Sequence, residues 1–481
     1  MVSMNPYDAV SSIAPEFDDS VVWMNCPPVS MEALRGHPVL LLFWNAGSAH
    51  CHNALQSLSS FANRFRDSVA VVAVHVPKFD YERDGTVAWE SLQAEGALVP
   101  LVHDVDWAAW QQYGVTAWPT AVLVDASGAI RERVVGDAAI EAMAPALEAL
   151  ADENFSQVSG QLDLPRLENP TARGALSAPG GLVATSSRLY IADTGHHRVL
   201  ECTHDGRILR RIGNGNRDSV DGLADVAGFN SPRGMVVLQD VLYVADTGNH
   251  SIRRINTRTG EVDTVVGTGR RGEAVPGPLK EARDSPLDRP WGLAATQSGL
   301  LFTQAGAHQL WSLELGTRVL SRVSGRGTFG HEDGTANDAT FAQPTALTLM
   351  GEFACVLDTA ASALRQVKLT DGSVRTLFGR GLFEFGAKDG GIRHALMQSP
   401  MALAPMSGGT GLWIADTGNG ALRKWVSRTQ ALSTVELPNT LRRPTALASW
   451  QNHLWIADSG SHLIWRLDVE SGAMHRLPVG E

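Results

Sequence analysis

The hydrophobic pattern of the first third alternates between two kinds of segment. Residues 39–44 and 69–76 are continuous apolar runs, typical of strands buried on both faces of a sheet. Between them, apolar residues recur every three or four positions, which predicts one buried stripe of a helix: Leu55, Leu58, Phe61 and Phe65. Ser48 is placed to cap the start of that helix through its hydroxyl.

The pattern continues in the same alternation as far as residue 150. Helices are predicted over 89–95, 107–113 and 137–150, a short strand over 99–102, and a hairpin from 121–125 to 130–135. The resulting order, βαβαβαββα, predicts a central sheet with helices on both sides.

The remaining two-thirds repeats one unit six times. An alternating strand, Leu-Tyr-Val-Ala-Asp-Thr-Gly at 242–248, recurs with its Asp position at Asp193, Asp246, Gln304, Asp358, Asp416 and Asp458. A proline precedes that position by 14 residues in five copies and by 16 in the other: Pro179, Pro232, Pro290, Pro344, Pro400 and Pro444. A Gly or Ala follows each proline by two, where strands would crowd around a central axis.

Each copy contains four short strands, and in the second copy they are 234–238, 242–246, 251–255 and 262–266. Four antiparallel strands make one propeller blade, so six copies predict a six-bladed β-propeller. The last copy, 445–479, holds four strands by itself, although residues 161–166 could add another.

Several polar residues recur with the repeat, and we interpret them as structural. The repeated Asp is expected to accept backbone N–H groups in the turn that follows it, as in an Asx-turn. The His four residues later, at His197, His250, His308 and His462, is expected to share a role in that turn. Arg253, Arg365 and Arg423 are expected to pair with neighbouring blades. The Gly-x-Gly and Asp-Gly segments are interpreted as long connections between blades.

Charge separates the same two regions. The chain has 481 residues and a net charge of −11, and residues 1–155 carry 20 acidic and 7 basic residues, a net of −13. This charge argues against a general nucleic-acid binder. No apolar run is long enough to span a membrane, and the start lacks the basic and apolar parts of a secretory signal. With four cysteines, the sequence predicts a cytoplasmic protein.

The segment Phe-Trp-Asn-Ala-Gly-Ser-Ala-His-Cys at 43–51 resembles the active-site segment of the thioredoxin family, where a Cys-x-x-Cys lies between a strand and a helix. Trp118 and Pro119 resemble the second landmark of that family, which implies a cis proline facing the dithiol. In this chain the attacking cysteine is replaced by Ser48, and Cys51 alone remains. The C-terminal repeats resemble NHL repeats, and the two together resemble proteins that join these domains.

Four interpretations of the Ser48–Cys51 segment stay open. The site can have kept the fold and lost the redox step, because dithiol exchange needs an attacking thiolate and a second thiol. Cys51 can act as a single thiol. Cys26 can be a relocated partner for Cys51. A metal site with His50 and His52 is disfavoured, since ligands so close on one helix start do not converge easily.

The sequence therefore predicts a multidomain protein: an α/β thioredoxin-like domain over 1–150, a linker over 151–175, and an all-β six-bladed NHL-type propeller over 176–481. We expect an interaction or scaffold protein that binds a protein or peptide on the propeller face, without cofactor or metal, and without nucleic-acid or membrane partners. The alternative is a thiol-disulfide oxidoreductase that uses Cys51 and a client-selecting propeller. Because some NHL-type propellers are zinc-dependent lyases, a propeller-borne hydrolase or lyase ranks third.

Overall fold

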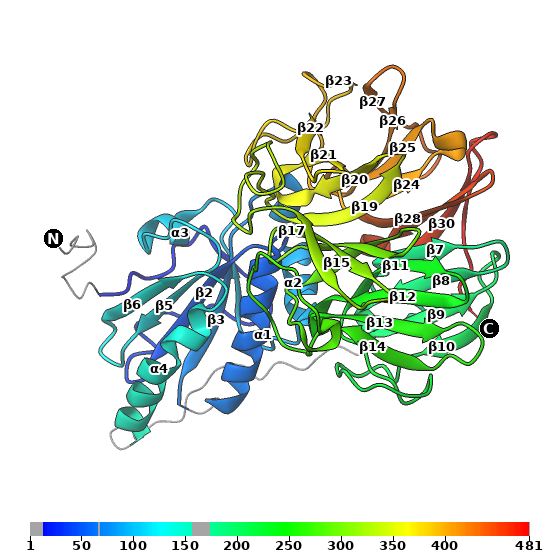
Figure 1. The fold of residues 1–481 in the computed structure, drawn as a ribbon. Coiled ribbons are helices and arrows are strands. Elements are labelled where there is room, and N and C mark those ends of the chain that lie inside the picture. Colours follow the sequence, from blue (N-terminus) through cyan, green and yellow to red (C-terminus); the bar gives the residue numbers. More distant parts are fainter. Residues whose placement is uncertain (1–12, 66–67, 156–173, 481) are drawn as a thin grey trace. The chain divides into compact units, whose positions relative to one another are not determined.

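A computed structural model gives the fold of the chain and describes residues 13–65, 68–155 and 174–480. The chain divides into two compact units, residues 1–171 and 172–481. The first is a thioredoxin-like α/β domain and the second is a six-bladed β-propeller, so the predicted fold class is confirmed (Figure 1).

The N-terminal unit is built on one six-stranded sheet. Its strands are β1 (Val22–Trp23), β2 (Val39–Trp44), β3 (Ala70–His75), β4 (Leu101–His103), β5 (Thr120–Val124) and β6 (Ile130–Val135). Its helices are α1 (Ala49–Arg64), α2 (Gly85–Ala94), α3 (Ala108–Gln112) and α4 (Ala139–Phe155), with a short 3₁₀ helix η1 (Asp80–Arg83). The strand order is β1-β4-β3-β2-β5-β6, in which β2, β3 and β4 run parallel.

Strand β2 lies at the centre of two hydrophobic cores. Leu40, Leu42 and Trp44 pack on one face with residues of α1, α2 and α4. Leu41 and Phe43 pack on the other face with residues of α3. Because both faces are covered, every residue of β2 is buried, which explains its unbroken apolar run.

Helix α4 ends later than the sequence indicated. It continues through Phe155, five residues into the predicted linker 151–175. Ala151 is buried against the core beneath α1 and α4, so packing extends the helix where no local stop signal ends it. Most of the predicted linker lies outside the described residues.

The propeller has four main strands in each blade, in chain order. Blade 1 is β7 (Gly181–Ala184), β8 (Leu189–Asp193), β9 (Arg198–Cys202) and β10 (Ile208–Ile212); blade 2 is β11 (Pro232–Leu238), β12 (Val241–Asp246), β13 (Ser251–Asn256) and β14 (Val262–Val266). Blade 3 is β15 (Pro290–Ala295), β16 (Gly299–Gln304), β17 (Gln309–Glu314) and β18 (Leu320–Ser324); blade 4 is β19 (Pro344–Met350), β20 (Phe353–Asp358), β21 (Ala363–Lys368) and β22 (Val374–Phe378). Blade 5 is β24 (Ala402–Pro405), β25 (Gly411–Asp416), β26 (Ala421–Val426) and β27 (Ala431–Thr434), with the extra strand β23 (Gly390–Gly391); blade 6 is β28 (Pro444–Trp450), β29 (His453–Asp458), β30 (Leu463–Asp468) and β31 (Met474–Arg476).

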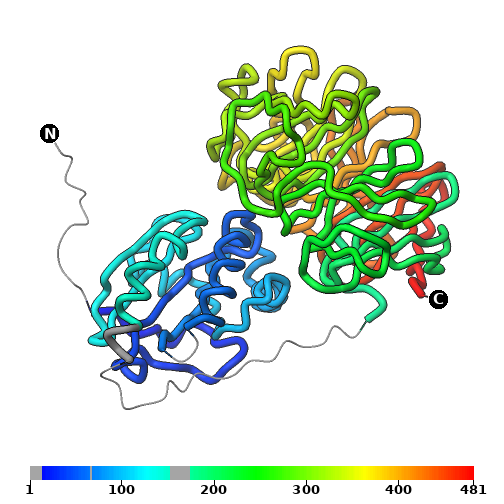
Figure 2. Tube along the Cα trace, turned by 60° about the horizontal axis from the view of Figure 1, so that its bottom comes forward, coloured from blue at the N-terminus to red at the C-terminus, as the bar shows by residue number. Residues whose placement is uncertain are grey.

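The first strands of successive blades contact one another around the ring, and β28 contacts β7 to close it (Figure 2). A Cβ atom added to Gly234 would lie 1.9 Å from the carbonyl oxygen of Trp291 on the next blade, which explains the small residue in each copy. The hydroxyl of Thr445 donates to the carbonyl of Pro179 at 2.9 Å across the closing seam. Blade 6 supplies its own four strands, and residues 161–166 lie outside the described residues.

The repeated Asp does not cap the turn after it, which corrects the Asx-turn prediction. Asp246 accepts the backbone N–H of Asn230 at 2.7 Å, in the connection that precedes its own blade. Strand pairing is the reason: Pro232, at the start of β11, lies opposite Asp246, and this brings Asn230 beside the carboxylate. Blade 1 has the equivalent bond, from Ser177 to Asp193 at 2.7 Å.

The repeated His does have a shared role in the turn, as predicted. His197, His250, His308 and His462 all adopt left-handed backbone angles, with φ between 50° and 56°. Three of the rings also accept a backbone N–H from the next blade: His197 from Ser231, His250 from Arg289 and His462 from Ala178. The histidine therefore reverses the chain and joins two blades.

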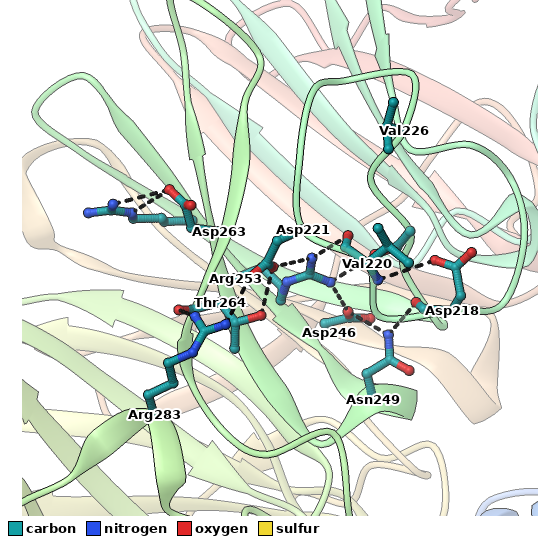
Figure 3. A network of polar contacts seen from close by, with 12 residues as sticks. Asp218, Val220, Asp221, Val226, Asp246, Asn249, Arg253, Asp263, Thr264 and Arg283 are labelled. Atoms are coloured by element: carbon teal, nitrogen blue, oxygen red, sulfur yellow. Dashed lines mark hydrogen bonds and ion pairs between the residues drawn. The ribbon is translucent and has the colours of Figure 1, made fainter.

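Arg253 in β13 is fully buried and joins its blade to the incoming connection (Figure 3). Its guanidinium lies 2.9 Å from Asp246 and 2.8 Å from Asp221, and it donates to the carbonyls of Gly228 and Val220. Arg365 and Arg423 repeat the arrangement in blades 4 and 5. Arg365 binds the carboxylates of Asp358 and Asp333 and the carbonyls of Thr340 and Glu332. Arg423 binds the carboxylates of Asp416 and Asp389 and the carbonyls of Leu396 and Lys388. Each arginine thus pairs with its own blade and with the preceding connection.

We expect Arg253→Met to destabilise the propeller by about 3–5 kcal/mol at neutral pH, because it leaves the buried carboxylate of Asp246 without its counter-charge. The matched control is Arg254→Met on the same strand. Arg254 and its partner Asp263 are half-exposed, so Arg254→Met should lower the free energy of unfolding by about 1 kcal/mol or less. Urea unfolding of both variants measures the difference, and equal losses would contradict the role given to Arg253.

The loss in Arg253→Met should also depend on pH. Burial raises the pKa of Asp246 to about 6 even with the arginine present. Without the arginine its folded-state pKa rises further above the unfolded value of about 3.9, so the folded variant binds the extra proton. The loss of unfolding free energy caused by Arg253→Met should therefore be smaller at pH 5 than at pH 7.5.

Candidate functional site

The segment between β2 and α1 holds the residues that the sequence singled out. Ser48 is the N-cap of α1, with extended backbone angles, and its hydroxyl accepts the N–H of Cys51 at 3.4 Å. Cys51 is the third residue of the helix. Serine is a favoured N-cap because its oxygen satisfies one of the unpaired amides of the first turn. The hydroxyl therefore has a structural task at the position where thioredoxins carry their attacking thiol.

The Cys51 sulfur is fully buried and accepts the backbone N–H of Asn45 at 3.2 Å. Burial raises the pKa of the Cys51 thiol to about 12, because a thiolate would lose its hydration. Hydrogen bonds from Ser48 and Asn45 lower the pKa by less. At neutral pH the thiol is protonated and therefore a poor nucleophile.

A buried carboxyl group fixes the loop in front of Cys51. The Asn45 amide donates to Glu82 at 2.6 Å and to the carbonyl of Val76 at 3.1 Å. Glu82 in η1 is fully buried, and burial raises its pKa. It also accepts the backbone N–H groups of Lys78 and Phe79. Sequence analysis missed Glu82, whose signal was its place three residues after Phe79, where a carboxylate can cap a helical turn.

Two buried histidines attach the same loop to the sheet. Ala46 donates its N–H to Nε2 of His75 at 3.3 Å, and Nδ1 of His75 lies 3.0 Å from Nδ1 of His103. Nε2 of His103 donates to the carbonyl of Arg83 at 3.1 Å. When both rings are neutral, each of these three hydrogen bonds has one hydrogen atom to donate and one acceptor to receive it. Burial lowers the pKa of both histidines, and the neighbouring ring also lowers that of His75.

Trp118 and Pro119 lie at the end of the sheet where β2 leads into the Ser48 segment. The peptide bond between them is cis. Thr120 of β5 pairs with Phe43 of β2, so Pro119 precedes β5 beside the end of β2, where the Ser48 loop begins. The Trp118 ring packs on Trp107 and Trp110, with ring centroids 5.2 and 4.6 Å apart. The register thus places Trp118 and Pro119 at the end of the sheet where Ser48 and Cys51 follow β2.

Cys26 is not a partner for Cys51. Asn25 bonds to Val99 and Leu101 at the start of β4, whereas Cys51 follows the opposite, carboxyl end of β2, which is parallel to β4. The two cysteines therefore lie at opposite ends of the sheet, and both are free. The sequence left this pairing open because it could not give the end of the sheet that Cys26 faces.

His50 and His52 flank Cys51 and face different carboxylates. His50 lies 2.9 Å from Asp137, and His52 lies 2.8 Å from Glu95. Within the described ranges, no group of three His, Cys, Asp or Glu side chains could hold a metal ion.

Known proteins resemble this chain in both units. The model of the AhpC/TSA family matches residues 10–133, and that of the NHL repeat matches residues 229–255. The chain joins a thioredoxin-like domain to an NHL-repeat propeller. NHL repeat-containing protein 2 of Bos taurus is 29% identical, over 97% of this chain and 72% of that protein.

Protein SUPPRESSOR OF QUENCHING 1, chloroplastic, of Arabidopsis thaliana is 28% identical, over 96% of this chain and 47% of that protein. Among solved structures, that of a streptogramin B lyase has a TM-score of 0.41 and 12% identity, over 64% of this chain and 84% of that one. In the part of the chain that the structure describes, no helix is long and apolar enough to cross a membrane.

We expect Cys51 to resist alkylation in the folded protein. At pH 8, iodoacetamide should label half-buried Cys26 first, and Cys51 should react only after unfolding, because its thiol is buried and protonated. Mass spectrometry of the labelled peptides measures both sites in one sample. Labelling of Cys51 as fast as Cys26 would contradict the buried, protonated thiol.

The histidine pair should make the N-terminal unit less stable in acid. The unfolded histidines have a pKa of about 6.5 and the folded ones lie lower, so the unfolded chain binds more protons below that value. Stability should be fully present above about pH 6.5 and fall as pH falls. His103→Gln, which keeps an acceptor and a donor, should reduce the slope of urea-unfolding free energy against pH, and an unchanged slope would contradict the role given to this histidine pair.

Proposed function

We propose that this chain is an interaction or scaffold protein with a degenerate thioredoxin site and a propeller that binds a protein or peptide partner. The observation that carries the first part is the pair Ser48 and Cys51. Dithiol exchange requires one thiolate to attack a disulfide and a second thiol to release the mixed disulfide. Ser48 supplies an alcohol that caps α1, and the sole thiol of the segment is buried.

The propeller supports the binding role through its rigid frame. The connections before blades 2, 4 and 5 are held by buried arginines, so their exposed side chains are displayed on a fixed backbone. Binding residues are commonly presented in this way, on loops positioned by a stable scaffold. A preformed surface also lowers the ordering cost of association.

The proposal includes a reducing, cytoplasmic compartment, since all four cysteines are free thiols. It includes neither nucleic acid nor a membrane among the partners, in line with the net charge of −11.

A second candidate is a thiol-disulfide oxidoreductase that acts through Cys51 alone, with the propeller selecting the client. The hydrogen bonds from Asn45 and Ser48 to the sulfur favour this candidate, because both stabilise a thiolate. The larger effect of burial opposes it.

Reduction of a protein disulfide by dithiothreitol tests the proposal. The full chain should not raise the rate above dithiothreitol alone, whereas Ser48→Cys should raise it by about tenfold or more, because a thiol at the helix N-terminus has a lowered pKa. Ser48→Cys combined with Cys51→Ser is the matched control and should lose turnover, since no resolving thiol remains. Turnover by the natural chain that Cys51→Ser abolishes would refute the scaffold proposal and establish the second candidate.

A further inference from the structure

Three connections of the propeller share one backbone conformation. They are residues 213–231, 325–343 and 379–399, which we call the blade-2, blade-4 and blade-5 connections. In the blade-2 connection, Val226 donates its N–H to Leu223 and Gly228 donates to Val220, both at 2.9 Å. The blade-4 bonds run from Asp338 to Thr335 and from Thr340 to Glu332, and the blade-5 bonds from His394 to Gly391 and from Leu396 to Lys388.

The same side chains also anchor all three connections. Asp221 binds Arg253 and the hydroxyl of Thr264 in the outer strand of blade 2 (Figure 3). The equivalent pairs are Arg365 and Thr376 around Asp333, and Arg423 and Thr434 around Asp389. The connections therefore act as internal copies, in which a residue required by the fold should recur.

Several positions of the blade-2 connection do not recur in the other two copies, and three of them carry exposed apolar side chains. Val220, Leu223 and Val226 are apolar and are 47%, 61% and 50% exposed. The blade-4 equivalents are Glu332, Thr335 and Asp338, and the blade-5 equivalents are Lys388, Gly391 and His394. Since polar residues or glycine occupy these three positions in the other two copies, neither the backbone nor the buried network requires apolar side chains at them.

Three large apolar side chains exposed between residues 220 and 226 are a feature that interaction surfaces commonly share. Scattered exposed apolar residues are normal, and the other two connections have fewer of them: Phe329 in blade 4, and Phe383 and Ile392 in blade 5. Leu223 and Val226 are three apart in a helical turn and so are neighbours on its surface. The turn is anchored through Asp221 and the carbonyl of Val220, so little ordering would accompany docking.

Charge around this apolar turn indicates the kind of partner. Asp218 and Asp225 flank it, and within the described residues no basic side chain pairs with either. Their equivalents are Gly330 and Asn337 in blade 4, and Gly386 and Arg393 in blade 5, so these acids also depart from the repeat. Arg210 and Ala224 both lie beside Gly260, and Arg210 is bound to Glu201 and to two carbonyls.

We propose that Val220, Leu223 and Val226 form the docking site for a segment of a partner protein whose apolar side chains are flanked by lysine or arginine. The inference rests on the proposed binding role of the propeller and locates it on one connection. The N-terminal unit, with its net charge of −13 over residues 1–155, does not complement the acidic rim.

The test uses a library of random peptides displayed on phage and selected on the full chain. The key variant, Val220→Gln with Leu223→Thr and Val226→Asn, removes the apolar contacts without changing charge. Phe329→Ser is the matched control from the blade-4 connection. Selected peptides should carry apolar residues with an excess of Lys and Arg, and the triple variant should weaken their binding by about tenfold or more while the control does not.

Asp225→Asn should weaken the same peptides by about threefold at low salt and by less at high salt. Thermal unfolding of the triple variant should match that of the natural chain, since polar residues or glycine occupy these three positions in blades 4 and 5. Peptides that bind the triple variant as well as they bind the natural chain would overturn this docking site, while the proposed binding role of the propeller would stand. Selection of acidic peptides, or self-association of the chain that the triple variant abolishes, would overturn the proposed partner, and recovery of no binding peptide would count against both proposals.

Discussion

A buried guanidinium between two carboxylates is the interaction on which the propeller depends. Transferring such a group from water is costly, and the cost is offset where paired charge and backbone oxygen surround it. Arg253, Arg365 and Arg423 meet that condition, because each binds one Asp of its own blade and one Asp of the preceding connection. A blade can therefore bury its arginine only after the chain before it has docked. This requirement couples neighbouring repeats beyond the apolar contacts between their sheets.

In the N-terminal unit, burial keeps a group uncharged: the thiol of Cys51 is buried without a counter-charge. The Cys51 sulfur has two hydrogen bonds but no positive charge beside it, so desolvation decides its pKa and the thiol stays protonated. The surrounding polar groups, Asn45, Glu82 and the pair His75 and His103, bind one another and the backbone of the loop. They hold the loop in the shape of a thioredoxin site, while Ser48 removes the group that such a site would activate. Conformation and chemistry are thus separable here.

Much of the fold could be predicted because it follows from patterns among residues that are close in sequence. The unbroken run of β2, the stripe of α1 and the spacing of six prolines each follow from neighbours in sequence. The errors concern partners that are distant in sequence. The partner of Asp246 lies 16 residues upstream and is set by the register of β11 on β12, which no spacing reveals. Similarly, no spacing shows which end of the sheet Cys26 faces, and the capping position of Glu82 does not reveal that its side chain also binds Asn45.

The repeats separate what the fold requires from what it permits. Where three connections use the same hydrogen bonds, a residue common to all of them, such as the Asp that meets the buried arginine, is explained by the frame. A large apolar residue that occurs in one copy alone, such as Leu223 where the others have Thr335 and Gly391, has to be explained by something outside the frame. The same reasoning applies to Ser48, which satisfies the helix N-terminus and leaves the strand, loop and helix of a thioredoxin intact. Both departures leave the backbone unchanged and alter only the side chains that it presents, so binding and reactivity can change in this chain without a change of fold.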